Sequence, residues 1–108
     1  MKIIVQSLHF DADRKLLEMI QKKYEKLDSF FDRITQVEVI LRINKSVNGE
    51  NKMVEVKIFI PGNTLFAKLQ CSTFEEAVDL SVDTLSGQLI RHKEKTQSQN
   101  YKSILKES

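Results

Sequence analysis

Hydrophobic residues recur along this chain in two different patterns, one typical of helices and one typical of strands. Between Asp13 and about Phe31 they are spaced three and four residues apart, which predicts an amphipathic helix. A second stripe of this kind follows a capping sequence at residues 72–76 and predicts a long helix ending at about Lys95. The apolar residues of the first helix are Leu16, Leu17, Ile20, Tyr24, Leu27 and Phe31. Those of the second are Phe74, Val78, Val82, Leu85 and Leu89.

Alternation with a period of two predicts strands in the rest of the chain. Residues 2–7 form a β-prone run, and residues 34–44, 53–60 and 65–71 alternate between apolar and polar side chains. Residues 45–51 are expected to form a loop, and Pro61, Gly62 and Asn63 a turn. The side chains expected to face inward are Val37, Val39, Leu41, Ile43, Val54, Val56, Ile58, Ile60, Leu65, Ala67, Leu69 and Cys71.

The order of these elements, β-α-β-β-β-α, indicates an α+β fold. The first β-α-β step should be a right-handed parallel crossover, and the short later links should join antiparallel strands. We therefore expect a four-stranded mixed sheet with two helices packed on one face, formed by residues 1–96. Residues 97–108 are expected to be a mobile polar C-terminal tail. Residues expected on the open sheet face are Glu38, Arg42, Glu55, Lys57, Lys68 and Gln70.

The composition indicates the cellular compartment and excludes several kinds of chemistry, but it says little about the binding partner. A single cysteine cannot form an internal disulfide, and no segment resembles a signal peptide or a membrane span, so a cytoplasmic protein is expected. His9 and His92 are far apart, and no phosphate-binding glycine loop or metal-ligand spacing occurs. We therefore expect no enzyme, cofactor, metal, membrane or small-molecule substrate. The net charge of +2 by itself does not identify a nucleic-acid binder.

The lysines of the first helix have a more specific arrangement. Lys15, Lys22 and Lys26 fall within about 40° on one flank of the apolar stripe, and Lys23 lies between them and the core. Beside a second helix, such a row could follow a phosphate backbone, although a solvated helix face gives the same pattern. On the second helix, Arg91 and Lys95 share a flank with Thr84 and Gly87. The basic residues at its end are also explained by the helix dipole alone.

Three segments resemble the ribosome hibernation promoting factor family, also called ribosome-associated inhibitor or sigma-54 modulation protein. They are residues 22–37, with Phe30-Phe31-Asp32-Arg33-Ile34 at their centre, residues 74–79, and residues 85–95. The resemblance covers about residues 1–96. It implies a fold similar to double-stranded RNA-binding domains, and docking in the decoding region of the small ribosomal subunit on 16S rRNA. It further implies that transfer and messenger RNA are excluded and translation is inhibited, without catalysis.

The resemblance also implies a set of RNA-binding residues. Thr84 and Gly87 stand where relatives typically place basic residues, so less charge is expected on that side. The chain is expected to be the short form, monomeric off the ribosome and without a C-terminal domain that pairs ribosomes. Two alternatives are a regulatory module that binds a protein and a generic double-stranded RNA binder. The residues that match family basic sites are Lys22, Lys23, Lys26, Arg91, Lys93 and Lys95. With Lys15 from the same helix flank, and Arg33, the expected RNA-binding residues are Lys15, Lys22, Lys23, Lys26, Arg33, Arg91, Lys93 and Lys95.

Overall fold

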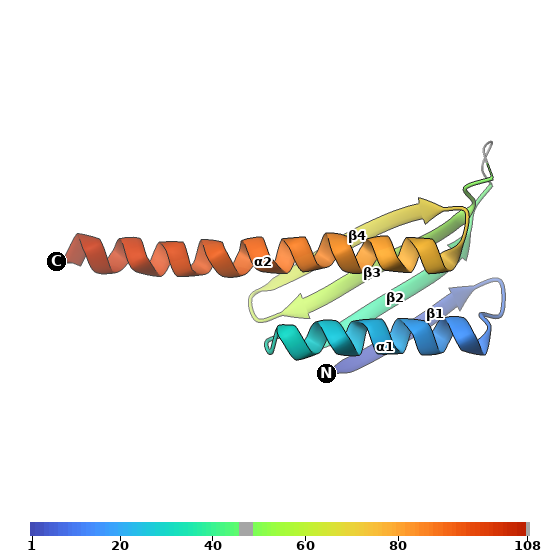
Figure 1. Cartoon of the computed structure of the whole chain (residues 1–108), viewed down its shortest axis with the longest axis horizontal. Coiled ribbons are helices and arrows are strands. Elements are labelled where there is room, and N and C mark those ends of the chain that lie inside the picture. Colours follow the sequence, from blue (N-terminus) through green and yellow to red (C-terminus); the bar gives the residue numbers. More distant parts are fainter. Residues whose placement is uncertain (46–48, 108) are drawn as a thin grey trace.

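In the part of the chain that the structure describes, two helices lie side by side on one face of a four-stranded sheet (Figure 1). The computed structural model describes the backbone of residues 1–45 and 49–107, and the side chains of residues 1–45 and 49–93. The elements are β1 (Lys2–Leu8), α1 (Arg14–Phe30), β2 (Gln36–Ile43), β3 (Lys52–Ile60), β4 (Asn63–Cys71) and α2 (Phe74–Glu107). No helix within the described residues carries an apolar stretch long enough to cross a bilayer.

The sheet has the strand order β1-β2-β3-β4. β1 pairs in parallel with β2, with Val5 opposite Val39. The remaining pairs are antiparallel, with Val56 opposite both Val39 in β2 and Ala67 in β4. The predicted α+β class, element order and mixed sheet are therefore confirmed.

Burial follows the predicted apolar patterns, with two errors in the sets expected to face inward. Leu17, which precedes Tyr24 by two turns of α1, is 38% exposed. Ile43 is 50% exposed, because it is the last residue of β2 and lies at the end of the strand. The side chains from two strands at the centre of the core are almost completely buried: Val37, Val39, Leu41, Val54, Val56 and Ile58.

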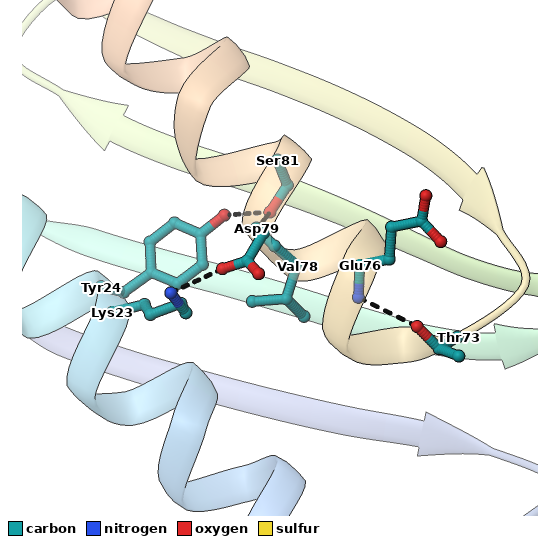
Figure 2. A network of polar contacts seen from close by, with 7 residues as sticks. All are labelled: Lys23, Tyr24, Thr73, Glu76, Val78, Asp79 and Ser81. Carbon is teal, nitrogen blue, oxygen red and sulfur yellow. Dashed lines mark hydrogen bonds and ion pairs between the residues drawn. The ribbon is translucent and has the colours of Figure 1, made fainter.

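Side-chain caps begin both helices. An Asp13 carboxylate oxygen accepts a hydrogen bond from the backbone N–H of Leu16 at 2.7 Å, at the start of α1. For α2, the Thr73 hydroxyl accepts from the backbone N–H of Glu76 at 3.1 Å (Figure 2). The capping sequence predicted at residues 72–76 therefore acts through Thr73. Phe10 then stacks on Phe74 at 5.1 Å, which ties the β1–α1 loop to the start of α2.

Helix α2 is longer than predicted. It continues past Lys95 to Glu107 and extends well beyond the sheet (Figure 1). The chain after Thr96 contains no glycine or proline, so it lacks the residues that stop a helix most strongly. The mobility expected for residues 97–108 stays a prediction, because their side chains lie outside the described residues.

A buried hydrogen bond joins the two helices. The Ser81 hydroxyl donates to the carbonyl oxygen of Val78 at 2.7 Å. Its single proton is then in use, so the Tyr24 hydroxyl donates to the Ser81 oxygen at 2.6 Å (Figure 2). Both residues are 0% exposed, and burial raises the pKa of the Tyr24 phenol well above its ordinary value. The phenol therefore stays protonated and keeps the helices in register.

Replacing the two partners separately should have unequal effects. Ser81→Ala leaves the Tyr24 hydroxyl buried without its acceptor and should lower the free energy of unfolding by about 1–3 kcal/mol. Tyr24→Phe removes the buried donor instead and should cost about 1 kcal/mol. The double variant should resemble Tyr24→Phe alone, because no hydroxyl is then stranded. Urea denaturation measures all three, with Ser86→Ala on the same helix as the control. Strictly additive losses would contradict this pairing.

Candidate nucleic-acid interface

The position of Lys23 shows which flank of α1 faces α2. Its Nζ lies 2.5 Å from Oδ1 of Asp79 on α2 (Figure 2). The side chains are 40% and 53% exposed, so this ion pair is at the surface of the groove between the helices. Such exposed pairs typically contribute between about 0 and 1 kcal/mol to stability. The pair therefore identifies the facing sides of the helices without holding them together strongly.

The other lysines of α1 lie on the same flank, turned further toward solvent. Lys22 and Lys26 are exposed and lie within about 40° of each other around the helix axis. Lys15, Lys22 and Lys23 surround one shallow depression together with Glu18 and Met19. The structure thus brings Lys15, Lys22, Lys23 and Lys26 together along the side of α1 next to α2, and these four residues form the lysine row.

The facing flank of α2 is acidic near its N-terminus. Glu75 precedes Asp79 by one turn and lies within about 40° of it around the axis. Acidic residues favour this position because the N-terminus of a helix carries a partial positive charge. The two carboxylates offset part of the positive charge of the lysine row. That these acids face the lysines follows from the packing of α1 against α2 and could not be read from the sequence of α2 alone.

Arg91 lies away from the lysine row. The Gln88 side chain donates to the backbone oxygen of Phe66 at 3.0 Å, so this side of α2 faces β4. Gln88 is about 180° around the helix from Asp79, and Arg91 is about 60° from Gln88 but about 120° from Asp79. Arg91 therefore belongs to the flank above β4, together with Thr84. The basic residues predicted to bind RNA therefore lie on two different flanks, and an RNA contact of Arg91 would be separate from the groove.

The remaining predicted basic residues gather at the far end of the groove. Lys93 is about 40° around the helix from Asp79, which places it on the flank facing α1. Lys93 and Arg33, which follows α1, are both exposed and line the same cavity. The side chain of Lys95 lies outside the described residues. Phe30, at the edge of this cavity, is 68% exposed and was missed from the sequence because its spacing continues the lysine row rather than the apolar stripe.

Other reactive groups do not form a second site among the described residues. Cys71 is buried, and burial together with the charges of Glu76 and Glu50 raises the pKa of its thiol. A raised pKa disfavours the reactive thiolate, in agreement with the prediction of a small buried hydrophobic residue. Within residues 1–45 and 49–93, no three His, Cys, Asp or Glu side chains lie close enough together to bind a metal ion.

Comparison with known proteins identifies the family. Residues 3–97 match the model of the family described as sigma 54 modulation protein / S30EA ribosomal protein. The chain belongs to this family. A ribosome hibernation promoting factor from Pseudomonas putida is 32% identical over 98 residues, covering 91% of this chain and 92% of the relative. The factor of the same name from Escherichia coli K12 is 28% identical over 95 residues, covering 88% and 96%.

Solved structures give the same result for the fold of this family member. A ribosomal subunit interface protein from Coxiella burnetii superposes with a TM-score of 0.78 at 28% identity. The match covers 86% of this chain and 98% of that one. The four-stranded sheet with two helices on one face is therefore the fold that the chain shares with this interface protein.

Removing the acid opposite Lys23 should strengthen binding of polyanions to this family member. Asp79→Asn removes a negative charge from the groove and frees the Lys23 ammonium. The variant should elute from a heparin column at higher salt than the wild type, with little change in stability because the ion pair is exposed. Glu38→Gln makes the same charge change on the opposite sheet face and is the control. Equal shifts for both variants would show that only net charge matters.

Gly87 lies mid-helix on α2 without a packing requirement. A Cβ at this position would meet no described heavy atom within 4 Å. Gly87→Ala should therefore raise the free energy of unfolding by about 1 kcal/mol, through helix propensity. Gly62 is the contrasting control, because its φ of 77° favours glycine, so Gly62→Ala should be destabilising. Chemical denaturation measures both, and a lower stability of Gly87→Ala would show that a neighbour approaches closely there.

Proposed function

We propose that this protein is a non-enzymatic ribosome hibernation factor of the cytoplasm. It binds the 16S rRNA of the small ribosomal subunit in the decoding region, as a monomer until it docks. Binding there excludes transfer RNA and messenger RNA and so inhibits translation. Family membership over residues 3–97 supports a role on the ribosome, as do the relatives named ribosome hibernation promoting factors.

The observation that carries the RNA contact is the exposed lysine row on the flank of α1 beside α2. A row of ammonium groups along a rigid helix attracts a phosphate backbone and releases its counterions. Such contacts position a protein on RNA without reading base sequence, which suits a structured and shape-specific target such as rRNA. In this proposal the protein inhibits translation by occupying the binding site of transfer and messenger RNA, and no group of the protein needs to react.

Neutralising the lysine row should weaken ribosome binding and its salt dependence together. The test variant is Lys15→Gln/Lys22→Gln/Lys26→Gln, measured by co-sedimentation with small subunits at several salt concentrations. Removing one lysine–phosphate interaction should reduce the slope of log K against log salt by about 1, so the triple variant should bind more weakly with a shallower slope. Gln is used because it approximates the length and helix propensity of the lysine side chain.

The matched control makes the same charge change on the opposite face of the sheet. Lys2→Gln/Lys57→Gln/Lys68→Gln alters three exposed lysines there and should leave both affinity and slope close to the wild type. Equal weakening by the two triple variants would refute the lysine-row contact. A complex that survives ribonuclease would support the protein-binding alternative, and equal affinity for free duplex RNA would support a generic double-stranded RNA binder.

A further inference from the structure

A cavity of about 230 Å³ opens at the end of the groove, where the C-terminus of α1, the β3–β4 turn and α2 meet. Its inner wall is apolar and includes Ile34, Ile60 and Leu89, each at least 90% buried. Pro61 closes one side from the turn. The lysine-row contact proposed above does not use this cavity.

The rim of the cavity combines an aromatic ring with cations. The Phe30 side chain borders the apolar hollow and is 68% exposed, so its ring is accessible to a ligand. Arg33 and Lys93 supply positive charge at the same rim, against one carboxylate from Asp32. An apolar interior with a net positive rim suits a flat ligand that is apolar on its faces and carries negative charge outside the cavity.

The lysine row leads to this rim. Lys22, Lys26 and Phe30 follow one another at four-residue spacing, so each lies about 6 Å further along α1 than the one before. A strand whose phosphates contact Lys22 and Lys26 would therefore reach Phe30 with its next nucleotides. Aromatic side chains beside a cationic track are a common means of holding unpaired bases.

We propose that the cavity accepts one unpaired nucleobase of the bound RNA. The base stacks on the ring of Phe30 and enters toward Leu89, while Arg33 and Lys93 neutralise its flanking phosphates. This inference rests on the proposed function, because it takes the strand bound by the lysine row to be rRNA. It adds a contact to a base, whereas the lysine row contacts only the backbone.

The test removes the ring and compares binding with a matched variant. Phe30→Ala should weaken co-sedimentation with small ribosomal subunits about tenfold, the order expected for one base–aromatic stack. Phe30→Trp keeps an aromatic face and should bind within about twofold of the wild type. Phe66→Ala is the matched control, because Phe66 is 46% exposed but projects from the opposite sheet face, and it should change nothing. Thermal unfolding checks that each variant is folded.

Chemical probing of the rRNA identifies the occupant. With base-specific reagents for all four bases, the wild type should protect an unpaired base that becomes reactive again in the complex with Phe30→Ala. Hydroxyl-radical protection of the backbone at the lysine row should persist in that complex. Probing uses protein in excess, so that both complexes are saturated.

Results other than the expected ones contradict either the proposed function or the nucleobase proposal, and the two cases can be told apart. If the wild type does not bind small subunits, the proposed function fails. If Phe30→Ala binds and protects bases like the wild type, the nucleobase proposal fails while the proposed function stands. If Phe30→Ala binds weakly but no base protection changes, Phe30 contributes to ribosome binding without holding a base, and the nucleobase proposal fails.

Discussion

The hydrogen bond from Tyr24 to Ser81 sets the arrangement on which the candidate interface depends. It lies fully buried between α1 and α2, where an unpaired hydroxyl would be costly, so the two helices have one favourable register. That register places the residue before Tyr24, Lys23, beside Asp79. The groove and its facing charges thus follow from a contact in the core rather than from the surface ion pair.

The exposed ion pair between Lys23 and Asp79 can be replaced by an ion pair between Lys23 and an anionic ligand. The Lys23–Asp79 pair is exposed and screened by solvent, so a phosphate can take over the ammonium at little cost in folding stability. The acidic flank of α2 lowers the affinity of the groove for polyanions in general, since any nucleic-acid strand in the groove must also approach Glu75 and Asp79. In the proposed complex, a structured RNA that contacts only the solvent side of the lysine row would avoid this repulsion, whereas an arbitrary strand would not.

Most of the fold was predictable from the sequence, because apolar spacing distinguishes strands from helices and each face must be buried. The exceptions lie where local context decides, such as the exposed Ile43 at the end of β2 and the extension of α2 past Lys95. The candidate site was predictable only in part. The lysines of α1 could be grouped from their spacing, but the side of α2 that faces them depends on packing between elements far apart in sequence. Arg91 was therefore grouped with the groove, whereas its position around α2 is nearer to the flank above β4, and its RNA contact stays a prediction.

The direction of the helices gives the groove an electrostatic gradient. α1 and α2 run in the same direction (Figure 1). Asp79 lies beside Lys23 of the lysine row, and Glu75 lies one turn earlier on α2. Further along, the acids give way to Lys93, and Arg33 follows the C-terminus of α1, where a helix dipole favours cations. Positive charge is therefore least compensated at the Phe30 end. This end of the groove should attract a polyanion most strongly, so in the proposed complex backbone attraction and base stacking would act at the same end of the molecule.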